Sequence, residues 1–178
     1  MIIYQNTNLL LSPAQTLVNT VNTVGVMGAG IAKEFKYYYP KMFQQYAQVC
    51  HRHQFQPGQL QLFKGEQGFN YTRKRWVLNF PTKKHWRDPS QLAYVEAGLQ
   101  KFVATYKARG ITSVAFPPLG AGCGGLNTKQ VLALMEQYLG QLDIPVYIHQ
   151  FRPARGQQGQ QYNEIIRNLS TDSPLAAN

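Results

Sequence analysis

The sequence predicts an α/β fold in which helices cover both faces of a β-sheet. Along residues 1–151, short apolar segments of strand length alternate with longer amphipathic segments. The chain has 178 residues, of which 44% are hydrophobic and 12% aromatic. This composition excludes a disordered chain, and the length is sufficient for one packed core without disulfides or a structural metal.

Six short apolar segments are predicted to be strands: residues 1–4, 16–19, 60–63, 75–80, 113–116 and 145–149. Four longer segments between them are predicted to be helices: residues 28–35, 41–52, 88–108 and 128–141. An alternation of this kind is typical of a sheet that is sandwiched between helices.

Two of the predicted helices carry start signals. Asp88 is the predicted N-cap of the third helix, because Pro89 follows it at the first helical position and Gln91 lies three residues beyond the cap. Asn127 is the predicted N-cap of the fourth helix, with Gln130 three residues further on. Both patterns resemble a capping box.

The character of the sequence changes after Phe151. Residues 152–161 form a low-complexity run rich in Gln, Arg and Gly, which is typical of a linker or an exposed arm. One short helix is predicted over residues 163–169, followed by a polar tail. We therefore expect a domain over residues 1–151 and a linker and C-terminal tail over residues 152–178.

The chain is strongly basic. It has 18 Lys and Arg against 8 Asp and Glu, a formal net charge of +10. Such an excess predicts a polyanionic partner, with nucleic acid ranked above an anionic membrane surface and above a basic domain that is merely soluble. The cations cluster between Tyr71 and Arg87, where no acid is present: Arg73, Lys74, Arg75, Lys83, Lys84 and Arg87. This clustering favours a binding face.

Several protein classes are excluded by the sequence. No apolar run approaches the roughly 18 residues of a membrane-spanning helix, and the N-terminus shows no secretory signal. Cys50 and Cys123 lie in unlike contexts, so we expect no disulfide and a cytoplasmic location. Because CxxC and HExxH spacings are absent, neither a metal site nor a cofactor is expected.

Two glycine-rich loops each lie between a predicted strand and a predicted helix, over residues 24–32 and 117–126. Each alone favours a plain tight turn, but two such loops at one end of a sheet can hold a diphosphate between them. The chain has no GxxxxGK[ST] sequence, which excludes a Walker-type NTPase. Residues 120–125 match GxGxxG, yet the next strand does not end in the acid that a dinucleotide fold requires.

A basic loop follows the fourth predicted strand, over residues 79–87. Its amines, guanidinium, imidazole and indole can pair with phosphates, stack on a base or present a nucleophilic amine; the alternative is a solvated basic turn. Asn19 and Asn22 lie next to the first glycine loop. Their amides can fix backbone turns or bind ribose hydroxyls, and the sequence leaves both interpretations open.

Three segments together resemble the macrodomain family, and within it the DarG-type DNA ADP-ribosyl glycohydrolase macrodomains. They are LVNTVNTVGVMGAGIA at residues 17–32, NFPTK at residues 79–83 and PPLGAGCGGL at residues 117–126. The resemblance implies a three-layer α/β/α domain with a mixed six-stranded sheet that binds ADP-ribose in a cleft at its crest. It further implies removal of ADP-ribose from thymidine bases of DNA, which reverses the action of a DarT-type toxin.

The resemblance also assigns roles to residues. Lys83 and Asn22 take the catalytic positions, with Lys83 either attacking the anomeric carbon or assisting the departing base. Residues that match ADP-ribose contacts are Asn8, Leu9, Asn19, Thr20, Gly28, Ala29, Gly30, Ile31, Thr82, Pro118, Leu119, Gly120, Ala121, Gly122, Cys123, Gly124 and Gly125. The DNA-binding candidates are Arg73, Lys74, Arg75, Lys84, His85, Trp86 and Arg87.

The chain departs from the family pattern at two positions. Asn8 stands where many macrodomains carry an aspartate, and Gly125 stands where some lysine-using relatives carry one. The expected partners are ADP-ribose and ADP-ribosylated DNA, with a DarT-type toxin as a further candidate, although the segment after Phe151 is shorter than a separate toxin-binding domain. We expect a monomer without a membrane partner. The alternatives are hydrolysis of another ADP-ribose adduct, on protein, RNA or an acyl group, and a non-catalytic ADP-ribose reader.

Overall fold

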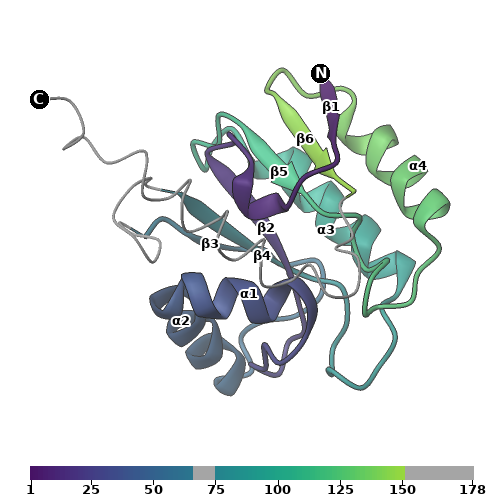
Figure 1. The fold of residues 1–178 in the computed structure, drawn as a ribbon. Helices are drawn as coiled ribbons and strands as arrows, with labels where there is room; N and C mark the ends of the chain where they lie inside the picture. Colours follow the sequence, from purple (N-terminus) through teal and green to yellow (C-terminus); the bar gives the residue numbers. More distant parts are fainter. Residues whose placement is uncertain (66–74, 151–178) are drawn as a thin grey trace, which may run out of the picture.

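A computed structural model describes residues 1–65 and 75–150. A six-stranded sheet lies between two pairs of helices (Figure 1), as the alternation of segments predicts. The strands are β1 (Ile2–Gln5), β2 (Thr16–Val21), β3 (Gln61–Phe63), β4 (Trp76–Pro81), β5 (Val114–Phe116) and β6 (Val146–His149). The helices are α1 (Gly30–Tyr38), α2 (Pro40–His51), α3 (Leu92–Thr105) and α4 (Thr128–Leu139), with a short 3-10 helix, η1 (Leu9–Leu11). The predicted linker and tail, residues 152–178, lie outside the described residues, as do Arg73 and Lys74.

The order of the strands in the sheet is β1-β6-β5-β2-β4-β3. All neighbouring strands are parallel except β3, which pairs antiparallel with β4, so the sheet is mixed. Five strands therefore end at the same edge. Since β5, β2 and β4 are neighbours, the connections that follow them leave this edge side by side, which is where α/β proteins bind ligands.

Each face of the sheet has its own hydrophobic core. Side chains alternate between the faces along a strand, so that Leu17 and Val77 pack toward α1 and α2, whereas Val18 and Leu78 pack toward α3 and α4. All four of these side chains are fully buried. Helices on both faces explain why the strands are apolar along their whole length. No helix in the described part of the chain is long and apolar enough to cross a membrane.

Only one of the two predicted helix caps is confirmed. Asn127 caps α4, because its side chain accepts a hydrogen bond from the backbone amide of Gln130 at 3.1 Å. The prediction for Asp88 is wrong: α3 begins at Leu92, with Gln91 in the N-cap position. The residues before α3 instead make other bonds: the amide of Ser90 donates to Gly124 O of the loop after β5 at 2.9 Å, and that of Gln91 donates to Thr82 O, at the start of the same connection, at 3.1 Å. These tertiary bonds outweigh the local helix signal.

Arg75 is not part of a nucleic-acid-binding surface, which corrects its assignment as a DNA contact. Its side chain is only 7% exposed. Its Nη1 donates to the carbonyl oxygen of Ser12 and, at 2.7 Å, to that of Ala14. These two carbonyl groups lie between η1 and β2. The guanidinium therefore satisfies buried backbone acceptors and fixes the entry into β2.

We expect Arg75→Met to lower the free energy of unfolding by about 2–4 kcal/mol, because Met retains much of the apolar volume but leaves two buried carbonyl groups without a charged donor. Urea denaturation measures this change. Arg87→Met, at an exposed position, is the matched control and should change the stability by less than about 1 kcal/mol. Equal stabilities of the two variants would contradict the structural role of Arg75.

Candidate active site

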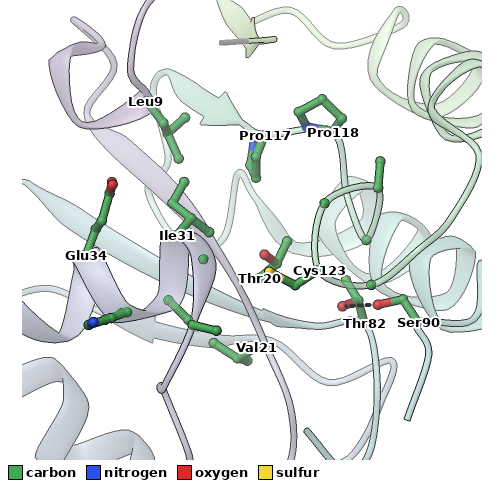
Figure 2. Close-up of a pocket in the computed structure, with 18 of the residues that line it drawn as sticks. Leu9, Thr20, Val21, Ile31, Glu34, Thr82, Ser90, Pro117, Pro118 and Cys123 are labelled. Atoms are coloured by element: carbon green, nitrogen blue, oxygen red, sulfur yellow. Dashed lines mark hydrogen bonds between the residues drawn. The ribbon is translucent and has the colours of Figure 1, made fainter. Parts of the chain in front are cut away.

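A pocket of about 990 Å³ opens at the edge of the sheet where the parallel strands end (Figure 2). Its walls come from the segments that follow β1, β2, β4, β5 and β6. Most of the predicted ADP-ribose contacts line it: Asn8, Leu9, Thr20, Gly28, Ala29, Gly30, Ile31, Thr82, Pro118, Gly120, Ala121, Gly122, Cys123 and Gly124. Both predicted catalytic residues, Asn22 and Lys83, also line it. A volume of this size is at the upper end for small-molecule sites.

The first glycine loop presents the N-terminus of α1 to the pocket. The N-cap residue Ala29 makes no side-chain capping bond, so the first amide groups of α1 keep their hydrogens for a ligand. Gly30 has a positive φ of 56°, a conformation that favours glycine. Together the unsatisfied amides and the helix dipole create a positive potential at residues 28–31, which suits an anion.

Asn22 holds this loop in shape. Its Nδ2 donates to Val26 O at 2.7 Å, and its Oδ1 accepts from the amide of Val24 at 3.1 Å and from the hydroxyl of Tyr46 at 2.8 Å. The side chain is 6% exposed. Burial raises the pKa of Tyr46, so its hydroxyl stays protonated and serves as a donor. Of the two interpretations left open by the sequence, the structure shows the first for Asn22: its amide fixes a backbone turn.

The second glycine loop forms the opposite wall. A Cβ on Gly124 would lie 2.1 Å from Ser90 Oγ, so only glycine allows this loop to close against the segment before α3. A Cβ on Gly122, in contrast, would meet nothing within 4 Å. Within the described chain, the amides of Gly122 and Cys123 have no hydrogen-bond partner. The two loops approach each other closely, because a Cβ on Gly30 would lie 3.1 Å from Cys123 Sγ.

The basic loop after β4 contributes one lysine to the pocket wall. Lys83 is half-buried, and its Nζ donates to Cys123 O at 3.4 Å. Lys84 is exposed and does not line the pocket; its carbonyl oxygen instead accepts from the amide of Thr23 at 2.9 Å. Thr82, just before Lys83, accepts a hydrogen bond from Ser90 Oγ at 3.0 Å, which Figure 2 shows as a dashed line. The basic loop is thus bonded to the second glycine loop and to the residue that precedes the first.

Trp86 lies at the mouth of the pocket and is 48% exposed. The guanidinium of Arg87 lies 4.6 Å from its ring centroid, and the ring of His85 lies 5.2 Å from it. An exposed indole flanked by cationic and polar groups can stack on a nucleobase. These three residues come from the predicted DNA-binding set and lie close together.

Three predicted ADP-ribose contacts are not among the residues that line the pocket. Burial corrects the assignment of two of them, Asn19 and Leu119, whereas the assignment of Gly125 stays a prediction. Asn19 is fully buried and donates from Nδ2 to Asn79 Oδ1 at 3.0 Å, so its amide links β2 to β4. Leu119 is fully buried in the core beneath α3 and α4. Gly125 serves a turn with a φ of 76°. Asn19 and Leu119 thus support the pocket wall from the core side, whereas Gly125 is exposed.

The structure adds a pocket residue that the sequence interpretation missed. Glu34 of α1 lines the pocket and is half-buried. Burial raises the pKa of its carboxyl, and a side-chain hydrogen bond with Asn8 acts in the opposite direction. Helical spacing could have found it, because Glu34 lies three residues after Ile31 and four after Gly30, on the same face of the helix. Within the described chain, no three His, Cys, Asp or Glu residues gather as metal ligands would.

Comparisons with known proteins agree with this architecture. Residues 18–135 match the sequence model of the Macro domain. Curated relatives include the DNA ADP-ribosyl glycohydrolase of Thermus aquaticus, 44% identical over 80% of this chain and 39% of the relative, and that of Mycobacterium tuberculosis, 44% identical over 83% and 42%. The chain therefore spans about two fifths of the length of these relatives.

Solved structures resemble the whole described fold. The macrodomain of Mycobacterium tuberculosis DarG has a TM-score of 0.78 and 41% identity, covering 86% of this chain and 99% of that one. Thermosipho africanus DarTG in complex with ADP-ribose has a TM-score of 0.79 and 36% identity, covering 88% of this chain and 44% of that one. The predicted three-layer fold with a mixed six-stranded sheet is thus confirmed, and the chain belongs to the macrodomain family.

Proposed function

We propose that this domain, residues 1–151, binds ADP-ribose and hydrolyses its bond to a thymidine base of DNA, reversing the modification made by a DarT-type toxin. One observation carries the proposal: a half-buried lysine, Lys83, lies on the pocket wall beside two glycine loops that are built to bind anions. Relatives that are 44% identical are named DNA ADP-ribosyl glycohydrolases, and a related structure holds ADP-ribose.

The two glycine loops suit the diphosphate of ADP-ribose. The residues at the start of α1 line the pocket together with Gly122 and Cys123, and the amides of both sets lack partners within the described chain. A diphosphate between them would accept hydrogen bonds from two walls at once. Its two ends would then extend along the pocket in opposite directions, one toward Lys83 and the other toward Asn8 and Glu34.

Lys83 is the residue placed to act on the glycosidic bond. Cleavage of such a bond passes through an oxocarbenium-like state, and ordinary glycosidases use two carboxylates for it. Among the described residues that line the pocket, Glu34 is the single carboxylate, so a carboxylate pair is not available there. The Lys83 amine can attack the anomeric carbon or, as an ammonium, stabilise the departing base. Asn22 acts as a positioning residue by shaping the loop that contacts the distal ribose.

The mouth of the pocket favours a nucleic-acid substrate over an acyl ester. The indole of Trp86 and the guanidinium of Arg87 lie next to Lys83 in the same loop. The modified base would leave the pocket at this end, where the indole can stack on it or on its neighbour and the cation can contact phosphate.

Gly122→Val should weaken binding of ADP-ribose by about 10- to 100-fold, which corresponds to the 1–3 kcal/mol cost of forcing extra methyl groups into a filled site. The fold should persist, because a Cβ at this position meets nothing within 4 Å. Calorimetry measures the affinity and thermal unfolding checks the fold. Ala133→Val on the exposed surface of α4 is the control and should bind normally. If a folded Gly122→Val variant bound ADP-ribose with wild-type affinity, the diphosphate could not lie next to Gly122.

Lys83→Ala should slow release of ADP-ribose from thymidine-modified oligonucleotide by at least the 10²–10⁴-fold typical of a lost proton-transfer group, while binding of free ADP-ribose changes little. Single-turnover kinetics measure the release. Lys84→Ala is the matched control and should lose only several-fold, because its side chain is exposed outside the pocket.

The same assay separates the alternatives. Similar, modest losses in both lysine variants that recover at low salt would show a purely electrostatic loop. Release of ADP-ribose from modified protein but not from modified DNA would show that the substrate is a protein adduct. Binding without release from either substrate would make the domain a reader.

A further inference from the structure

The first glycine loop starts beside Lys83. The backbone amide of Thr23 donates to Lys84 O at 2.9 Å, so the residues that precede this bonded pair, Asn22 and Lys83, lie on neighbouring segments. Both also line the pocket. The conformation of the chain after Asn22 therefore decides the shape of the pocket next to the Lys83 amine.

Asn22 and the tip of this loop close around one hydroxyl group, that of Tyr46 in α2. The hydroxyl donates to Asn22 O at 2.9 Å and to Asn22 Oδ1 at 2.8 Å. Burial raises the pKa of Tyr46, whereas hydrogen bonds with the backbone amides of Gly25 and Val26 act in the opposite direction. A single buried oxygen atom of α2 thus meets the loop at its beginning and at its tip.

The ring of Tyr46 is held by contacts that do not involve its hydroxyl. It is fully buried, and the rings of Phe55 and Phe43 lie 6.1 Å and 6.3 Å from it. The loop approaches the same helix closely, because a Cβ on Gly25 would lie 3.3 Å from the Cβ of Cys50. Helix α2 therefore serves as a rigid support against which the loop closes.

We propose that Tyr46 is a positioning residue: its hydroxyl holds the first glycine loop in the form that receives the ribose at the scissile bond. This inference rests on the proposed function. The hydroxyl supplies one hydrogen, shared by two oxygens of Asn22, so its removal frees the loop while the packed ring stays in place. A displacement of the reacting group by about 1 Å costs up to about 10²-fold in rate.

The test is Tyr46→Phe, which removes the hydroxyl and keeps the ring. Calorimetry compares ADP-ribose with ADP, which has the diphosphate but lacks the second ribose. The variant should lose several-fold in affinity for ADP-ribose and little for ADP, because the first amides of α1 belong to the helix and not to the freed loop. Release of ADP-ribose from thymidine-modified oligonucleotide, followed in single turnovers at saturation, should slow by about 10- to 100-fold.

Two further variants keep the result specific. Tyr106→Phe removes the hydroxyl of a buried tyrosine on the other face of the sheet, where it donates to Asp143 Oδ1 at 2.5 Å. It should leave the affinities and the rate at their wild-type values. Gly25→Ala pushes the loop away from Cys50 without altering Tyr46, and should reproduce the losses of Tyr46→Phe. Thermal unfolding checks the fold of each variant.

Unchanged affinities and rate in folded Tyr46→Phe would overturn the inference, as would a wild-type protein that binds ADP-ribose no better than ADP. Equal weakening of both ligands would also overturn it, because that result shows a loss at the diphosphate. If Tyr46→Phe does not fold, wild-type behaviour of Gly25→Ala overturns the inference.

In all these cases the wild-type protein still releases ADP-ribose, and the proposed function stands. Binding of ADP-ribose by the wild-type protein without release would contradict the proposed hydrolysis. The ratio of the two affinities in Tyr46→Phe then decides the role of Tyr46. Failure of the wild-type protein to bind ADP-ribose would overturn both.

Discussion

Ser90 joins two loops that are far apart in the sequence, and the form of the pocket depends on this junction. Its hydroxyl donates to Thr82 and its backbone amide donates to Gly124 O, so the loop after β4 and the loop after β5 meet at one buried side chain. Gly124 is required because a Cβ there would overlap Ser90. Lys83 follows Thr82 directly, and its amine reaches the carbonyl of Cys123 in the joined loop. The position of Lys83 along the pocket wall is thus set by hydrogen bonds of backbone and hydroxyl groups rather than by salt bridges.

The strand order explains why these loops can meet at all. β5, β2 and β4 are adjacent and parallel, so three connections start within a few strand spacings of one another. A hydrogen bond between two buried side-chain amides, Asn19 and Asn79, links β2 to β4 two residues before each strand ends. Because these groups are fully buried, a shift in register would leave them unsatisfied. The register is therefore specified close to the point where the ligand-binding loops begin.

Sequence patterns predicted the features that depend on neighbours along the chain. Local apolar patterns and turn chemistry predicted six strands, four helices and the Asn127 cap. The three segments that resemble the macrodomain family contain most of the residues that line the pocket. The sequence did not predict features that depend on distant contacts. Asp88 carries a good cap signal, yet the amides of Ser90 and Gln91 bond to Gly124 and Thr82. Arg75 lies within a basic cluster, yet it is buried and donates to two carbonyl groups between η1 and β2. The place of Glu34 in the pocket was not predicted, because the sequence signals for the site come from loops and Glu34 lies within helix α1.

The bond between Thr23 and Lys84 has a consequence for how this surface can vary. Lys84 contributes only its carbonyl oxygen to that bond, and its ammonium group takes no part in it. The path of the basic loop is consequently independent of the side chain at this position. Charge at the rim is thus a separable property of the domain: it can be tuned, removed or reversed while the Lys83 amine, one residue earlier, keeps its place.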